Sequence, residues 1–190
     1  MKIGIDVSQT AFPSTGVANF TLKLVNNLFK EDKENEYVLF FSSFRGRFPS
    51  SSFQIPKDAK VTLKKFKFPP SVLNFLWNRL HILPIEKLIG DVDVFISSDW
   101  VEPPTQKAKK ATVLYDLIIF KYPEESHNKT EFNPFKLLIS PNIVASQKRK
   151  LVWVKKEVDK IICISEATKK DAEDILGIEK SKLVVIYPGL

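Results

Sequence analysis

The sequence predicts an α/β protein with a Rossmann-like, mostly parallel sheet flanked by helices. Apolar strand-like segments alternate with segments of helical periodicity along the 190-residue chain. Several strand-like segments, such as 37–41 (YVLFF), are continuously apolar rather than alternating, which indicates strands covered on both faces. At roughly 150 residues per domain, the length fits one domain, or one and a fraction. No internal repeat or low-complexity tract interrupts the pattern.

The expected strands are short apolar segments bounded by polar or turn residues. They cover residues 2–6, 37–41, 61–66, 92–97, 111–116, 160–165 and 182–187. A first helix starts at Val17, where apolar residues recur three and four positions apart. Residues 71–90 predict a helix whose polar residues fall on one side and which bends or breaks at Pro84.

The second half of the chain predicts two further helices. After a loop at 122–134, a long helical region with a break at Pro141 extends to about Val158. The segment 166–176 is a helix with Ser165 as its N-cap and Gly177 as the residue that ends it. His81 and His127 do not follow a strand directly, and they are interpreted as surface residues or as loop residues with satisfied hydrogen bonds.

Composition narrows the classes of function. Lys and Arg number 29 against 22 Asp and Glu, which gives a net charge of +7 and suits an anionic partner. No RNA-binding signature with interleaved aromatic residues is present, so nucleic acid is not expected as a partner. The single cysteine, Cys163, excludes an intrachain disulfide and favours a reducing, cytoplasmic compartment. With one Cys and two His, the sequence offers no metal-ligand spacing, and no metal is expected.

The start of the first helix is a candidate phosphate-binding position. Parallel α/β sheets bind ligands beyond the carboxyl ends of their strands. Gly16 and the amide of Val17 begin the first helix, where backbone N–H groups attract anions. The alternative is that Gly16 only makes the turn. The absence of a G-x-G-x-x-G pattern argues against a dinucleotide-binding oxidoreductase.

Two acid–aromatic pairs follow neighbouring strands of the predicted sheet. Asp99 and Trp100 come after strand 92–97, and this pair suits a sugar, with the carboxylate on hydroxyls and the ring on C–H groups. Tyr115 and Asp116 end strand 111–116, where catalytic groups often lie. The alternatives are a loop with one packed Trp, and a Tyr that covers the core beside an Asp that caps the next turn.

A basic side is predicted on the helix that precedes strand 160–165. The spacing of seven residues places its cations on one side, namely Lys148, Arg149, Lys155 and Lys156. Such a side can lie on an anionic membrane, with Lys64, Lys65 and Lys67 contributing. The alternative is a solvated helix face.

Three stretches resemble the N-terminal domain of GT-B glycosyltransferases, in the retaining family 4 group of hexosyltransferases. Residues 3–28 are similar to the family's opening strand, glycine loop and helix. Residues 91–124 are similar to its paired strands and the "HDL…PE" segment that follows them. Residues 158–189 are similar to its "SE-S/T" helix and the strand that closes on a Pro-Gly turn. The likeness covers nearly the whole chain and is weakest at 42–90.

The resemblance implies that residues 1–190 are the acceptor-side half of a two-domain enzyme. In the family, a second, C-terminal domain holds the nucleotide sugar and an E-x7-E motif, and that domain is absent from this chain. Gly16 and Asp116 match the family's pattern. Two positions depart from it, because Ala18 stands where a second Gly is common and Tyr115 stands where the family has a His. Tyr titrates near 10, which makes it a poor acid–base group at neutral pH.

The resemblance therefore implies transfer of a hexose from a nucleoside-diphosphate sugar to a glycan or lipid-linked acceptor. Asp116 is the candidate catalytic residue, and the other site candidates are Gly16, Val17, Asp99, Trp100 and Tyr115. The donor is a substrate, no cofactor is expected, and the chain alone is expected to be inactive. The missing domain would act in cis or in trans, in the cytoplasm or at the inner face of the membrane. The alternative is a non-catalytic binding or scaffold subunit that completes a partner chain.

Overall fold

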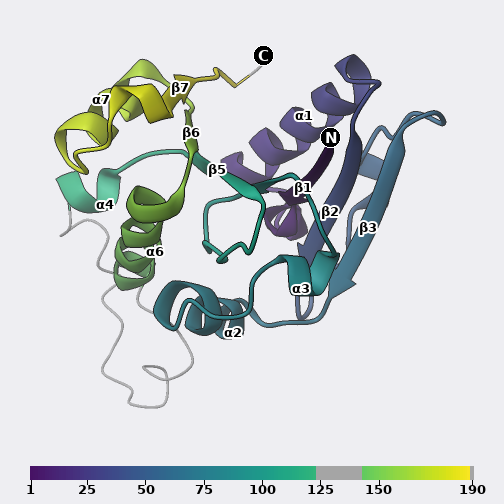
Figure 1. The fold of residues 1–190 in the computed structure, drawn as a ribbon, viewed down its shortest axis with the longest axis horizontal. Coiled ribbons are helices and arrows are strands. Elements are labelled where there is room, and N and C mark those ends of the chain that lie inside the picture. Colours follow the sequence, from purple (N-terminus) through teal and green to yellow (C-terminus); the bar gives the residue numbers. More distant parts are fainter. Residues whose placement is uncertain (123–142, 189–190) are drawn as a thin grey trace.

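A seven-stranded parallel sheet forms the centre of the part of the chain that the structure describes (Figure 1). The computed structural model describes residues 1–122 and 143–188. The strands are β1 (Lys2–Asp6), β2 (Glu36–Ser42), β3 (Lys60–Phe66), β4 (Val94–Ser97), β5 (Lys109–Leu114), β6 (Lys160–Cys163) and β7 (Leu183–Val185). Their order across the sheet is β3-β2-β1-β4-β5-β6-β7, and every neighbouring pair is parallel. The predicted α/β, Rossmann-like fold class is confirmed.

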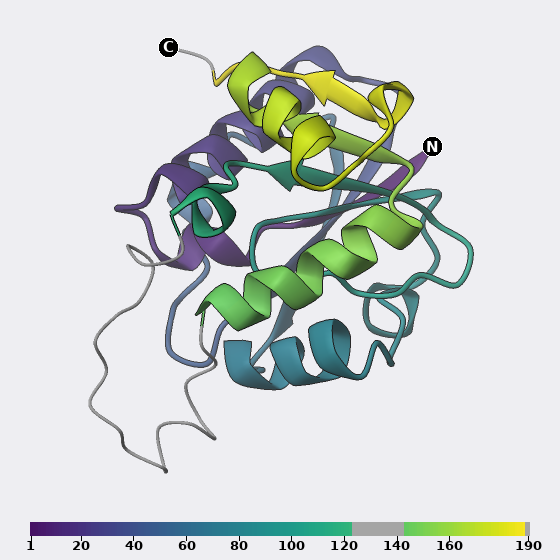
Figure 2. The ribbon, with the colours of Figure 1, turned by 90° about the vertical axis from the view of Figure 1, so that its left-hand side faces the viewer.

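Helices cover both faces of this sheet (Figures 1 and 2). The α- and π-helical segments are α1 (Gly16–Glu31), α2 (Pro70–Leu73), the π-helical turn η3 (Asn74–Arg79), α3 (Glu86–Ile89), α4 (Ile118–Lys121), α6 (Ile143–Glu157) and α7 (Glu166–Asp174). Short 3-10 turns are η1 (Ser8–Ala11), η2 (Ser50–Ser52) and η4 (Lys180–Lys182). Figure 2 shows α6 and the α2–η3 segment side by side on the face opposite α1.

The side chains of β2 show why the sheet needs helices on both faces. Successive residues of a strand point to opposite faces. Tyr37, Leu39 and Phe41 pack with Val25 and Phe29 of α1. On the other face, two β2 side chains pack with η3, α3 and the following loop, and these are Val38 and Phe40. All five of these β2 residues are buried, so the continuous apolar run in the sequence reports a strand between two layers.

The predicted start and capping residues of α7 are confirmed, whereas the helix ends at Asp174 rather than at 176. Ser165 is the N-cap, and its side-chain oxygen accepts a hydrogen bond from the backbone N–H of Thr168 at 3.0 Å. Gly177 has a φ of +61°, the left-handed conformation that ends a helix and favours glycine. At α1, Thr15 plays the N-cap role by accepting from the N–H of Ala18 at 3.2 Å.

The expectation of one helix over 71–90 that breaks at Pro84 is wrong in detail. The helix changes to a π-helical turn at Asn74 and ends at Arg79, and α3 begins only at Glu86. His81 and Leu83 have positive φ angles of 54° and 65°, so the chain has left the helix before Pro84. The Leu83 carbonyl in this turn accepts a hydrogen bond from Trp77 Nε1 at 2.9 Å.

Strands β5, β6 and β7 are shorter than predicted at their carboxyl ends. β5 ends at Leu114 rather than at 116, β6 at Cys163 rather than at 165, and β7 at Val185 rather than at 187. Within the long helical region, α6 ends at Glu157, close to the expected end. The predicted loop at 122–134, apart from its first residue, lies outside the described residues, and so do Pro141 and His127.

Candidate functional site

The sheet has a point where the direction of winding reverses, between β1 and β4. β1 connects to β2 and β3 on one side, and the chain then crosses to β4 on the other side of β1. In open α/β sheets, ligands bind in the crevice outside the carboxyl ends of the strands at such a point. The segments that leave the two strands carry Phe12, after β1, and Asp99 and Trp100, after β4.

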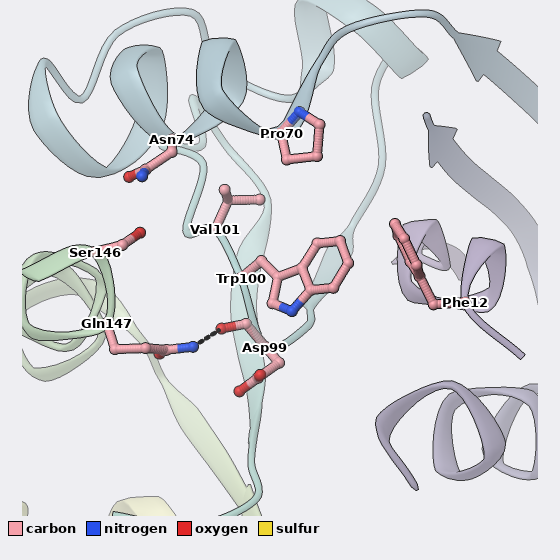
Figure 3. A pocket seen from close by; sticks show the side chains of 8 residues that line it. All are labelled: Phe12, Pro70, Asn74, Asp99, Trp100, Val101, Ser146 and Gln147. Carbon is pink, nitrogen blue, oxygen red and sulfur yellow. Dashed lines mark hydrogen bonds between the residues drawn. The ribbon is translucent and has the colours of Figure 1, made fainter. Parts of the chain in front are cut away.

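A pocket of about 320 Å³ lies at this edge of the sheet (Figure 3). Its lining residues are Phe12, Pro70, Asn74, Asp99, Trp100, Val101, Ser146 and Gln147. The rings of Phe12 and Trp100 meet edge to face with their centroids 5.1 Å apart. Together with Pro70, these two rings form an apolar side of the pocket. Across the pocket, η3 and α6 contribute polar side chains. Asp99 and Trp100 therefore lie together where a ligand has room to bind.

Hydrogen bonds from two helices fix the backbone of the loop after β4. The buried Asn78 of η3 donates from Nδ2 to the carbonyl of Trp100 at 2.9 Å, and its Oδ1 accepts from the N–H of Glu102 at 2.9 Å. From α6, Gln147 Nε2 donates to the carbonyl of Asp99 at 3.0 Å. Trp153 Nε1 in turn donates to the Asn78 carbonyl at 3.0 Å. The loop that carries Asp99 and Trp100 is thus held in place before any ligand arrives.

A buried charged cluster lies next to the start of the loop that carries Asp99 and Trp100. The Lys150 ammonium is buried and donates to the Ser98 carbonyl at 2.7 Å. Asp6, at the end of β1, accepts from the Ser8 N–H at 2.9 Å and from the Ser98 hydroxyl at 3.1 Å. Ser98 also contacts Gln9 Oε1. These bonds join the ends of β1 and β4 next to the loop that carries Asp99 and Trp100.

Burial sets the electrostatics of these groups. Burial raises the pKa of Asp6 and of Asp99, and the charge of Lys150 opposes both shifts. The charge of Asp116 adds to the rise in the pKa of Asp99. Burial lowers the pKa of Lys150, although nearby carboxylates oppose the shift. A carboxylate with a raised pKa is a stronger proton acceptor near neutral pH, and Asp99 has this property while it lines a pocket.

A second charged network joins the turn after η3 and strand β5 to α6. Lys110 is buried and lies 3.1 Å from Glu102 and 3.2 Å from Glu157. The His81 ring stacks on Trp153 with a centroid distance of 3.7 Å, and its Nε2 lies 2.9 Å from Glu157. Both nitrogens of His81 have partners, as expected for a histidine in a structural role.

The second acid–aromatic pair, after β5, lies in a different setting. Tyr115 is buried against α1, where its ring meets Phe20 edge to face at 5.4 Å and its hydroxyl lies 3.3 Å from Thr21 Oγ1. Burial raises the pKa of its phenol. Asp116 is exposed, and its Oδ1 accepts from the N–H of Ile118 at 3.1 Å, at the start of α4. Neither residue lines the pocket.

Gly16 and Val17 occupy the first turn of α1. Gly16 is exposed, and a Cβ added there would meet no atom within 4 Å, so the position is not crowded by neighbouring groups. Neither residue is among those that line the pocket. Their predicted approach to a phosphate, like the predicted roles of Asp116 and Tyr115, stays a prediction.

The cations on α6 divide between the interior and the surface. Lys148, Lys155 and Lys156 are exposed, whereas Arg149 is partly buried. Lys148 lies over the Phe120 ring at 5.6 Å and Lys156 over the Trp153 ring at 5.1 Å. Val152, between the exposed lysines on the same side of the helix, is 62% exposed. No helix among the described residues is long and apolar enough to cross a membrane.

Sequence reasoning missed half a dozen residues around the pocket. They are the lining residues Phe12, Pro70, Asn74, Val101, Ser146 and Gln147. The buried Lys150, which donates to the Ser98 carbonyl, was missed as well. Phe12 follows the first strand, so the rule that led to Asp99 could have found it. The helical residues gave no such signal, because a polar residue on a helix is usually solvated. Within the described ranges, no group of three or more His, Cys, Asp and Glu is placed to hold a metal ion.

The comparisons with known proteins concern the fold. No protein-family model and no curated protein matches this chain. The structure of UGT2 from Phytolacca americana, complexed with UDP-2fluoro-glucose and pterostilbene, matches with a TM-score of 0.50 and 9% identity. The match covers 100% of this chain and 52% of that one. A UGT transferase from Siraitia grosvenorii, in complex with UDP, has a TM-score of 0.48 and 7% identity over 99% of this chain and 50% of that one.

At these identities the likeness concerns the fold alone. This chain spans about half the length of the two matched structures. The match to UGT2 supports the same α/β, Rossmann-like fold, a parallel sheet flanked by helices.

Proposed function

We propose that this chain is the acceptor-side half of a GT-B glycosyltransferase. The intact enzyme moves a hexose from a nucleoside-diphosphate sugar to a glycan or lipid-linked acceptor. The observation that carries the proposal is a carboxylate, Asp99, beside an aromatic ring, Trp100, in a pocket at the winding reversal of the sheet. We also propose that the enzyme resembles family 4 and retains the configuration of the anomeric carbon. Both points are supported only by the three sequence stretches that resemble that family.

In this proposal the acceptor hydroxyl lies at Asp99. Its oxygen forms the new bond to the anomeric carbon of the donor sugar, and the bond from that carbon to the diphosphate breaks. The proton of the hydroxyl passes to the carboxylate of Asp99, which burial makes more basic. Asp116 lies close enough to influence the charge of Asp99 and stays the second carboxylate candidate.

The donor requires residues that this chain does not supply. Gly16 and Val17 would contribute backbone N–H groups toward the donor diphosphate from the first turn of α1. A second domain, in cis or in trans, would hold the nucleotide. The nucleotide sugar is a substrate in this proposal, and its diphosphate is the leaving group. The exposed lysines of α6 would place the domain at the cytoplasmic face of an anionic membrane.

Reconstitution tests this proposal. The 190-residue chain is mixed with nucleotide sugars and glycan acceptors, with and without a donor-binding domain encoded beyond codon 190 or by a neighbouring gene. Product is expected only when both parts are present. Turnover by the chain alone, well above a heat-treated control, would contradict the acceptor-half assignment. A folded donor domain that binds nucleotide but yields no product with this chain would support the scaffold alternative instead.

A further inference from the structure

One polar atom on the pocket has no protein partner. Asn74, the first residue of the π-helical turn, is 6% exposed, and its Oδ1 makes no hydrogen bond within the described residues. A buried polar atom without a partner costs free energy, so native proteins keep few of them. π-Helical turns are frequent at functional sites. The unpaired Oδ1 of Asn74 therefore calls for a partner outside the described residues, and a ligand in the pocket can supply one.

The pocket has two chemically different sides (Figure 3). Phe12, Pro70 and Trp100 form an apolar, mostly aromatic side. Facing them, the Asn74 amide points toward the α6 side, where Ser146 lies with its hydroxyl directed back into the space between η3 and α6. Asp99 closes the lower end in this view. A ligand that satisfies this pocket needs one apolar face and several hydrogen-bonding groups around its edge.

Three classes of ligand fit this arrangement poorly. A hydrocarbon chain would leave Asn74 without a partner. A phenol has one hydroxyl, which can satisfy Asp99 or Asn74 but not both. A phosphate would meet the Asp99 carboxylate, and the nearest buried cation, Lys150, already donates to the Ser98 carbonyl.

A sugar ring has the required chemistry. Its C–H groups form an apolar face that packs on an aromatic ring, and its hydroxyls lie around the edge. A hydroxyl both donates and accepts, so it satisfies Asn74 whichever end of the amide faces the ligand. The volume of about 320 Å³ falls at the lower end of the range typical of small-ligand pockets, roughly 300–1,000 Å³.

We propose that this pocket binds one sugar ring, with the ring stacked on Trp100, one hydroxyl at Asp99 and another hydroxyl bound by Asn74. This inference rests on the proposed function, because it names the acceptor class. It adds Asn74 as a residue that selects polyhydroxylated ligands. Asn74 would bind the ligand hydroxyl from the helical side of the pocket, away from the strand ends.

Binding to the 190-residue chain tests the proposal without a donor domain. Methyl glycosides of glucose, galactose, mannose and N-acetylglucosamine are titrated by ligand-observed NMR. At least one glycoside should bind, Trp100→Ala should abolish binding, and Asn74→Ala should weaken it by about tenfold. Asn27→Ala, on the exposed side of α1, is the matched control and should bind like the parent.

Thermal unfolding separates recognition from a structural role. Asn74→Ala removes an unpaired buried atom, so its Tm should equal or exceed that of the parent while binding falls. Unchanged affinity in Asn74→Ala, or a lowered Tm with unchanged affinity, would overturn the role of Asn74. Binding of 4-nitrophenol but of no glycoside would overturn the sugar assignment and leave a transferase with another acceptor. Displacement of a bound glycoside by UDP from the same pocket would instead contradict the proposed function.

Discussion

Two neighbouring strands, β4 and β5, end at the same edge of the sheet, and each is followed by an acid–aromatic pair. After β4, Asp99 and Trp100 line a pocket. After β5, Tyr115 is buried on α1, and Asp116 caps the turn into α4. The same residue types at equivalent positions therefore take different roles. The surroundings of the two pairs differ, because β4 lies at the winding reversal of the sheet and β5 does not.

The alternation of side chains along a strand explains the fate of Tyr115. Tyr115 is two residues after Val113, so it points to the same face, where both pack with Phe20 of α1. The loop after β4 leaves the sheet plane instead, and Asn78 and Gln147 hold its backbone. An aromatic residue that directly follows a strand and keeps its alternation of faces is thus expected in the core. An aromatic residue in a loop whose backbone is held by hydrogen bonds is expected to contact a ligand.

The largest expected effect separates the two carboxylates by activity. In the reconstituted enzyme, Asp99→Asn should lower transfer by about a hundredfold or more, because it removes the proton acceptor in the pocket. Asp116→Asn should also lower transfer substantially, but by less, since Asp116 lies outside the pocket lining. Tyr115→Phe should cost least. Initial rates at saturating donor measure all three variants, and equal losses in the two Asp variants would remove the distinction between the strand ends.

Substitutions at Tyr115 and Asp116 should affect the free energy of unfolding in the opposite order to their effects on transfer. Tyr115→Ala should lower the free energy of unfolding by about 3 kcal/mol, because it removes a buried ring from the α1 interface. Asp116→Asn should change it by no more than about 0.5 kcal/mol, as is usual for an exposed residue. Urea denaturation at neutral pH measures both variants. If Asp116→Asn unfolds the domain, Asp116 is a structural turn residue and not a carboxylate of the site.

The buried acids beside β4 should leave a signature in the pH dependence of stability. Burial raises the pKa of Asp6 in the folded state, so the folded protein holds its proton to a higher pH than the unfolded chain. The stability from this group is fully present below the unfolded pKa of about 3.9 and is lost as pH rises through the folded pKa. In Asp6→Asn this loss should disappear, so the Tm relative to the parent should increase from about pH 4 upward. A constant Tm difference across that range would contradict the burial of a charge at Asp6.

The smallest expected effect concerns the outer side of α6. Each of Lys148, Lys155 and Lys156 near an anionic surface is worth about 1 kcal/mol, and the exposed Val152 between them can enter the interface. Changing the three lysines to Gln should lower co-sedimentation with anionic vesicles at low salt. The matched control changes Lys87, Lys107 and Lys109, which are also exposed. Equal binding to anionic and neutral vesicles, or binding to neither, would favour a solvated face.

The sequence predicted the fold well and the pocket only in part. Strand positions and the caps of α7 follow from local chemistry, namely apolar runs, Ser165 and Gly177. The helical side of the pocket does not, because the polar side of segment 71–90 faces inward. Asn74 and Asn78 are buried there, whereas Val72 and Phe75 of the same segment are 39% and 50% exposed.

This inversion depends on partners that are distant in sequence. Asn78 bonds to the loop after β4, and the carbonyl of Asn78 bonds to Trp153 of α6. Periodicity alone shows that a helix has a polar side, but it does not show which side the tertiary structure buries. The pocket residues on η3 and α6 were therefore beyond what one sequence could reveal.

The most direct test of the central claim follows the indole N–H signals of the three tryptophans during a glycoside titration. Trp77 Nε1 donates to the Leu83 carbonyl and Trp153 Nε1 to the Asn78 carbonyl, so both signals should stay in place. The Trp100 signal should shift in a saturable manner with added methyl glycoside, because the ligand packs on its ring. An unchanged Trp100 indole signal, together with shifted backbone amide signals of Tyr115, Asp116 and Ile118, would place the ligand after β5 and contradict the account.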